Sequence, residues 1–340
     1  CPQCGEDILR AEYDLEPFKD GNWARRLNGR RHDIWRYHEL LPLHDPANIV
    51  TLGEGGTPLI PASQLGAMLG LKNLYLKDER QEPTNSFKDR QASVAISVMR
   101  ELGISEAVVA STGNVAMAYA AYAARAGIKL WVFLTSLVSS EKMQEVALYG
   151  AEVIKVTRTY DQTKLVANRF ARQKGLYEDR GIKSIAAVES MKTLAFELAE
   201  QLDGRAPDWF IQSVSGGMGP IGVVKGFEEL KALGVVDHVP AIGIVQSAGC
   251  APMATSATST NPTRMRIQRR PNAPVRAGFA GCRGGAGTGR GRSTGAGLGR
   301  GGSSTGRTCR TAVGSSSAWG IVQRSVGDSS TAGWSGTVCV

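Results

Sequence analysis

The stretch PTNSFKDRQ (residues 83–91) places a single lysine, Lys88, where a turn-forming sequence gives way to a segment with apolar residues at helical spacing. A lysine held at a helix start in a dry cleft has its ammonium form disfavoured by desolvation and by the helix dipole. Its free amine is then a nucleophile that forms Schiff bases with aldehydes. The other interpretation, an ordinary solvated lysine on a helix surface, stays open while Lys88 is considered alone.

A glycine-rich turn, SGGMGP (residues 215–220), follows an expected strand and precedes a helix that should begin near Pro220. Glycines let a ligand approach the backbone closely, and the free N–H groups of a helix start favour an anion such as phosphate. The turn matches neither the Walker sequence nor the dinucleotide-binding fingerprint. A tight turn whose glycines serve packing alone is the alternative interpretation.

The turn STGN supplies hydroxyl groups from Ser111 and Thr112 and an amide from Asn114 at another expected helix start. Ser, Thr and Asn are favoured at helix N-caps, which is the simplest explanation for their presence here. Alternatively, the same groups bind the carboxylate of a substrate.

The three turns lie within a regular series of strands and helices. Short apolar and β-branched runs predict strands at residues 74–77, 107–111, 129–134, 152–156, 208–214 and 241–246. Most of the segments between them have helical periodicity, including 160–174 and 221–233. Strands that alternate with helices predict right-handed βαβ units and open parallel sheets, which bind ligands where strands end and helices begin.

Together, the turns describe a site for an aldehyde that carries a phosphate, and pyridoxal 5′-phosphate is such a compound. The sequence resembles the fold-type II pyridoxal-phosphate enzymes and, within them, the threonine synthases. The segments that carry the resemblance are GEGGTPLIPASQLG (53–66), PTNSFKDR (83–90), STGNVAMAYAAYAARAG (111–127), SGGMGP (215–220) and KGFEEL (225–230). The resemblance covers about residues 1–250.

This resemblance implies an α/β fold of the tryptophan synthase β-like kind, with two open, mainly parallel-sheet domains, the second incomplete. It implies that Lys88 is catalytic, forms the Schiff base with the cofactor and moves protons at the substrate carbons. Asn114 would hydrogen-bond the cofactor ring oxygen, and Ser111 and Thr112 would lie near the substrate carboxylate. The cofactor phosphate would be bound by the glycine loop, which consists of Ser215, Gly216, Gly217, Met218 and Gly219. The implied lyase converts O-phosphohomoserine and water to threonine and phosphate.

One segment departs from the family pattern. Where the family often has Asn-Pro-x-Arg, with an arginine suited to a substrate phosphate, this sequence has Ser184, Ile185 and Ala187. A related pyridoxal-phosphate enzyme, of the β-replacement or threonine/serine deaminase type, therefore stays open.

The expected organisation has four parts. Residues 1–45 form an N-terminal arm, 46–183 a first α/β domain with Lys88 and the STGN turn, and 184–250 the start of a second α/β domain with the glycine loop. Residues 251–340 form a Gly/Arg-rich tail with 18 Gly and 12 Arg but no Lys, Glu or Tyr. Neither a helical nor a strand period persists in this tail, so we expect it to be mostly disordered.

The positive charge of the chain belongs to that tail. Residues 251–340 hold 12 basic and one acidic residue, which leaves 28 basic and 30 acidic residues in 1–250, out of 40 and 31 in all. We favour a reading-frame change as the origin of the tail. The alternative is an inactive α/β scaffold with a nucleic-acid-binding tail, although such tails usually contain aromatic residues for base stacking.

The remaining features exclude several classes of protein. No apolar run approaches the ~18–20 residues that span a bilayer, and the first residues lack a secretory pattern. We therefore expect a cytoplasmic enzyme with a small amino-acid substrate, no nucleic-acid or membrane partner, and a homodimer as the assembly to consider. Cys1 and Cys4 make half of a zinc-ribbon pattern, so no complete metal site is expected in this chain. Because the chain starts at Cys1, we expect further residues upstream.

Overall fold

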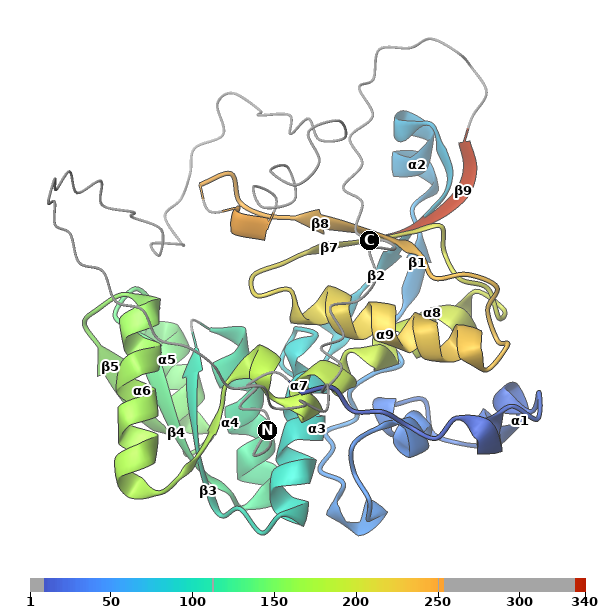
Figure 1. The fold of residues 1–340 in the computed structure, drawn as a ribbon. Coiled ribbons are helices and arrows are strands. Elements are labelled where there is room, and N and C mark those ends of the chain that lie inside the picture. Colours follow the sequence, from blue (N-terminus) through green and yellow to red (C-terminus); the bar gives the residue numbers. More distant parts are fainter. Residues whose placement is uncertain (1–8, 112, 250, 254–333) are drawn as a thin grey trace, which may run out of the picture.

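The computed structural model describes residues 9–111, 113–249, 251–253 and 334–340 (Figure 1). These residues form two sheets. A five-stranded sheet has the strand order β1-β2-β9-β7-β8, and a four-stranded sheet has the order β5-β4-β3-β6. Apart from the antiparallel pair β1 and β2, the described strands pair in parallel, as the alternation of strands and helices predicted.

The four-stranded sheet has a helix layer on each face. Its strands are β3 (Glu106–Ser111), β4 (Lys129–Thr135), β5 (Glu152–Val156) and β6 (Tyr177–Asp179). Val109 and Val132 face a core shared with α3 (Lys88–Glu101) and α4 (Asn114–Ala126). Val108 and Phe133 face the other way and pack with α6 (Tyr160–Lys174). This near-continuous apolar run along each strand is what a parallel sheet buried on both faces requires. Between β4 and β5 lies α5 (Ser140–Leu148).

The five-stranded sheet joins segments from distant parts of the chain. It contains β1 (Leu59–Pro61), β2 (Leu71–Lys77), β7 (Trp209–Ser213), β8 (Ala241–Val245) and β9 (Trp334–Cys339). In Figure 1, α8 (Lys192–Gln201) and α9 (Met218–Ala232) lie between this sheet and the four-stranded sheet, while α2 (Ser63–Leu69) lies beyond it. The short helix α7 (Ile185–Ser190) packs on both α3 and α9 and so connects the two halves.

The arm before β1 contains one short α-helix, α1 (Trp23–Leu27), and the 3₁₀ turns η1 (Glu16–Phe18), η2 (Ile34–Leu40) and η3 (Pro46–Asn48). Two further 3₁₀ turns are η4 (Glu79–Gln81) and η5 (Gly181–Lys183). Rings of Trp23 and Tyr37 contact Phe196 of α8, with centroid distances of 5.9 and 5.1 Å. These aromatic contacts fasten the arm to the core of the five-stranded half.

Two expectations from the sequence are corrected here. The strand expected at 74–77 was assigned to the first α/β unit, but β2 pairs within the five-stranded sheet beside β1 and β9. No strand period was found in the Gly/Arg-rich tail, yet its last residues form β9, which pairs in parallel with β2 and β7. Pairing partners on both sides supply the hydrogen bonds that hold this short segment in place. The rest of the expected tail, 254–333, lies outside the described residues.

Among the described residues, no helix has the length and apolar character needed to cross a membrane.

Candidate active site

Lys88 is the first residue of α3 and is partly buried. Its Nζ lies 4.2 Å from the centroid of the Phe87 ring. Burial lowers the pKa of the Lys88 ammonium to about 8, and no carboxylate of the described residues forms an ion pair with it. At a pKa of about 8, on the order of a tenth of Lys88 is a free amine at pH 7, far more than for an ordinary lysine.

The other enclosed lysines differ in having carboxylate partners. Lys77 Nζ lies 2.6 Å from Glu197 Oε2, and Lys192 Nζ lies 2.8 Å from Glu189 Oε2. Burial lowers the pKa of Lys77 and Lys192 too, but their carboxylate partners oppose that effect. Lys225 is also paired with Glu189. These ammonium groups are held in ion pairs, so Lys88 is the best placed of the four to act as a nucleophile.

The side chain of Asp89, the residue after Lys88, closes the loop that precedes the lysine by bonding back to Thr84. Asp89 is fully buried, and its two carboxylate oxygens accept hydrogen bonds from the backbone N–H and the hydroxyl of Thr84, at 2.7 and 2.8 Å. Asn85, between them, has a φ of +60°, a left-handed conformation that asparagine tolerates. Burial raises the pKa of Asp89 to about 6, while the Thr84 hydrogen bonds oppose that shift.

Arg90, the next residue, is fully buried in a cluster of charges. Its guanidinium donates to Glu197 at 2.5 and 2.9 Å and to Glu79 at 2.7 and 2.9 Å. Glu82 Oε1 lies 3.1 Å from Arg90 Nε. With Lys77, the cluster has three carboxyl groups and two cations, and burial raises the pKa of Glu82 to about 8. We call these five side chains the Arg90 cluster, and they tie α3 to α8, β2 and η4.

The STGN turn is built mainly as a helix cap. Ser111 Oγ accepts hydrogen bonds from the backbone N–H groups of Gly113 and Ala116, at 3.1 and 3.2 Å. Ser111 therefore accepts a helix-start N–H, although Gly113 and not Ser111 is the N-cap residue of α4. Asn114 is exposed at the first position of α4, whereas Thr112 lies outside the described residues.

The glycine loop connects β7 to α9, which begins at Met218 rather than near Pro220 as expected. Gly217 is the N-cap residue with a φ of +78°, a conformation that favours glycine. Ser215 and Gly216 are exposed, while Gly217, Met218 and Gly219 are buried. The side chain of Met253 lies against Gly217, since a Cβ there would be 2.3 Å from its Cε.

The three sets of residues lie at comparable junctions but contact different cores. Figure 1 shows the starts of α3 and α9 towards the region between the two sheets. Phe87, beside Lys88, and Met218 of the glycine loop pack in the core of the five-stranded half, whereas Ala116 of α4 packs in the core of the four-stranded half. The site expected from the sequence therefore draws on both halves of the molecule.

These residues fit an aldehyde that carries a phosphate. The Lys88 amine has no ion-pair partner in the described part of the chain, and a Cβ at Gly216 would meet nothing within 4 Å. The backbone N–H groups of Ser215, Gly216 and Gly217 donate to no acceptor among the described residues. An unpaired amine and a set of unpaired N–H donors at a helix start suit the two functional groups of such a ligand.

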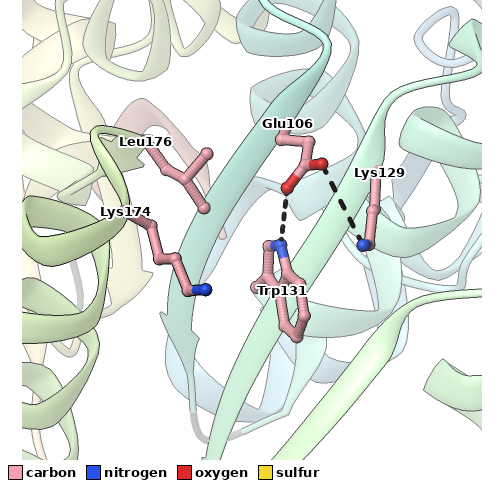
Figure 2. A pocket seen from close by; sticks show the side chains of 5 residues that line it. All are labelled: Glu106, Lys129, Trp131, Lys174 and Leu176. Carbon is pink, nitrogen blue, oxygen red and sulfur yellow. Dashed lines mark hydrogen bonds and ion pairs between the residues drawn. The ribbon is translucent and has the colours of Figure 1, made fainter.

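A pocket elsewhere carries none of the predicted residues (Figure 2). It is lined by Glu106, Lys129, Trp131, Lys174 and Leu176, and Trp131 Nε1 donates to Glu106 Oε2 at 3.1 Å. Glu106 and Lys129 are the first residues of β3 and β4. The pocket is thus at the amino ends of these strands, opposite the STGN turn.

Sequence reasoning missed the buried partners of the lysine loop, namely Thr84, Asp89 and the Arg90 cluster. One signal was available, because Glu197 interrupts the apolar face of the amphipathic segment MKTLAFELAEQL (191–202), and a buried charge must be paired. Cys1 and Cys4 lie outside the described residues, which contain no cluster of His, Cys, Asp and Glu suited to a metal.

Known proteins with similar sequences were found over most of the chain. A family model described as "Pyridoxal-phosphate dependent enzyme" matches residues 50–294. The threonine synthase of Methanocaldococcus jannaschii is 38% identical over 253 residues, which are 74% of this chain and 62% of that protein. The threonine synthase of Methanosarcina acetivorans is 33% identical over 263 residues, 77% of this chain and 64% of that protein. This chain therefore spans less than two thirds of the length of either relative.

Solved structures give the same fold. Maize serine racemase matches with a TM-score of 0.54 and 25% identity, covering 60% of each chain. The processed threonine deaminase isoform 2 of Solanum lycopersicum matches with a TM-score of 0.53 and 24% identity, covering 60% of this chain and 57% of that one. The family match includes Lys88, the STGN turn and the glycine loop and covers more than half of the sequence, so the chain belongs to the family of pyridoxal-phosphate-dependent enzymes.

Proposed function

We propose that this chain has the active site of a threonine synthase, a lyase that converts O-phosphohomoserine and water to threonine and phosphate. The observation that carries the proposal is Lys88, a partly buried amine at a helix start that has no carboxylate partner among the described residues. The similarity to two threonine synthases supports the choice of reaction within the family.

In this proposal, each part of the site has a separate task. Lys88 binds the aldehyde of the cofactor and carries protons between neighbouring carbons of the substrate. The glycine loop, residues 215–219, donates backbone N–H groups to the cofactor phosphate. Asn114 hydrogen-bonds the cofactor ring oxygen, and Ser111 and Thr112 lie beside the substrate carboxylate. When bound, pyridoxal phosphate supplies an electron sink for negative charge that develops on substrate carbons.

A second candidate is a deaminase or β-replacement enzyme whose substrate has no phosphate. The observation that favours it is at α7, where Ser184 is the N-cap and Ala187 is fully buried. At the position where the threonine synthase pattern has an arginine, this chain therefore has a small apolar side chain. The substrate phosphate would need another cationic partner.

The test is to load the protein with pyridoxal phosphate, reduce it with borohydride and map the labelled peptide. We expect the label on Lys88, and its loss in Lys88→Ala. The loaded protein is then given O-phosphohomoserine, and released phosphate and threonine are measured. Release of ammonia from threonine or serine, without phosphate release, would favour the second candidate. A label on Lys77 or Lys225 would refute the site.

A further inference from the structure

The loop that contains Lys88, residues 84–89, is closed by hydrogen bonds between its first and last residues. Thr84 and Asp89 are five residues apart, and two hydrogen bonds between them, at 2.7 and 2.8 Å, fix the ends of the loop to each other. Lys88 belongs to this loop and directly precedes Asp89 in the chain. Its backbone N–H also donates to Ser86 Oγ at 3.4 Å, within the same loop.

We propose that Asp89 and Thr84 are positioning residues that hold the Lys88 amine in the orientation needed to bind an aldehyde, a role that rests on the proposed function. The Asp89 carboxylate, fully buried, accepts two hydrogen bonds from one residue and forms no ion pair among the described residues. A carboxylate without a cation partner is an expensive group to bury. Its contacts therefore define the shape of the loop.

The helix α3 has other contacts besides these two hydrogen bonds. Arg90 fastens the first turn of α3 to Glu79 and Glu197, and the helix packs along its length on α4 and α7. Loss of the Asp89 contacts would leave α3 anchored while the residues before it become free to move. The effect on Lys88 and the effect on folding should therefore be separable.

The test compares the rate at which borohydride-trapped pyridoxal phosphate accumulates on Lys88 in the full chain and its variants. Asp89→Ala removes both hydrogen bonds, and we expect a decrease of roughly 10²-fold, the scale of an ångström-level misplacement. Asp89→Asn keeps one acceptor oxygen, and its amide can donate to the Thr84 hydroxyl, so it should restore most of the rate.

Glu101 provides the matched control on the same helix. Its carboxylate also accepts hydrogen bonds from two backbone N–H groups, those of His44 and Asp45, at 3.0 and 2.7 Å, but at the far end of α3. We expect Glu101→Ala to lower the urea midpoint while leaving the trapping rate on Lys88 unchanged. If Asp89→Ala fails to fold, Thr84→Val and Thr84→Ser take its place, with a slower rate expected for Val and a normal rate for Ser.

The outcomes separate the two proposals. If wild-type protein is not trapped on Lys88, the proposed function fails. If wild-type protein is trapped there and Asp89→Ala or Thr84→Val is trapped equally fast, the positioning role is wrong. A decrease in Asp89→Ala that Glu101→Ala matches at the same loss of stability would also overturn it.

Discussion

At the scale of single residues, the four lysines Lys77, Lys88, Lys192 and Lys225 differ in their partners. Three of them form ion pairs with glutamates, and Lys88 instead lies over the ring of Phe87. A carboxylate partner stabilises the charged form of an amine, whereas burial without one favours the neutral form. Lys88 should therefore be a better nucleophile than the three lysines that are paired with glutamates.

Modification of Lys88 by an amine-directed reagent should reach half of its maximal rate near pH 8, because burial lowers its pKa to about 8 from an ordinary value of 10.5. The free amine is the reactive form, so the rate rises as pH increases through the pKa. The measurement is peptide mapping by mass spectrometry over a pH series without cofactor. Lys192, fully buried between two carboxylates, serves as the internal control and should stay unmodified until the protein unfolds. A midpoint for Lys88 above pH 10 would contradict this prediction.

The sequence predicts a role for Lys88 but did not predict the side chains that hold its loop in place. The turn residues and the helical periodicity beside Lys88 are local signals, readable from PTNSFKDRQ itself. Arg90 is paired with Glu197, which is 107 positions away in the chain, and no local pattern specifies that pairing. For Ser111, the residue type indicated a hydrogen bond at the helix start, but the N-cap residue of α4 is Gly113, two positions further along the chain.

At the scale of elements, long periodic segments were predicted well. The helix expected at 160–174 is α6, with the same bounds. The strand expected at 208–214 is one residue longer than β7 at each end, and the strand expected at 241–246 is one residue longer than β8 at its carboxyl end. The short elements β1, β6 and α7 were not predicted, because three to six residues are too few to show a period.

Substitutions in the glycine loop should separate cofactor binding from backbone strain. Gly217→Val should weaken binding of pyridoxal phosphate and also destabilise the fold by on the order of 1 kcal/mol or more, since Gly217 has a φ of +78° and contacts Met253. Gly216→Val has open space around its Cβ, so it should weaken pyridoxal phosphate binding without that loss of stability. Affinities for pyridoxal phosphate and unphosphorylated pyridoxal, with urea midpoints, check both. Equal weakening of the two ligands by Gly216→Val would mean that the loop binds no phosphate.

The Arg90 cluster should make stability depend on pH. Burial raises the pKa of Glu82 from 4.5 to about 8, so the folded state holds a proton that the unfolded state loses first. The contribution of Glu82 to the free energy of unfolding is complete below pH 4.5 and is lost as pH rises towards 8, by on the order of 1 kcal/mol or more. Glu82→Gln should flatten this slope in urea titrations. An unchanged slope would show that Glu82 is ionised in the folded state.

At the scale of the whole molecule, the sequence could not assign strands to sheets. The strand at 74–77 was predicted, but its pairing partners were not. One partner, β1, is close to it in the chain, and the other, β9, is remote. Strand pairing depends on contacts between segments that share no sequence pattern. β9 contains Trp334, Thr337 and Val338, which strands favour, but this short segment follows a long Gly/Arg-rich stretch without a strand period, so its central position was not predicted.

A substitution in β9 tests that position. The backbone N–H of Thr337 donates to Asp208 Oδ2 at 2.5 Å, and its carbonyl accepts from the N–H of Asp208 at 2.9 Å. Thr337→Pro removes this donor and should lower the free energy of unfolding by about 1–3 kcal/mol. Thr337→Val keeps the N–H and should be nearly neutral. If both variants unfold at the same urea concentration as wild type, β9 does not pair within the sheet in solution.

The position of β9 also determines which of the two sheets can assemble first during translation. All strands of the four-stranded sheet lie between residues 106 and 179, so that sheet can assemble while the ribosome is still translating the remainder. The five-stranded sheet cannot, because β9 is translated well after the other four strands of this sheet and inserts between β2 and β7. Until then, the facing edges of β2 and β7 stay open, and open edges invite pairing with other nascent chains. A chaperone that covers them would act in that interval, and arrest of translation before residue 334 should give a product that aggregates.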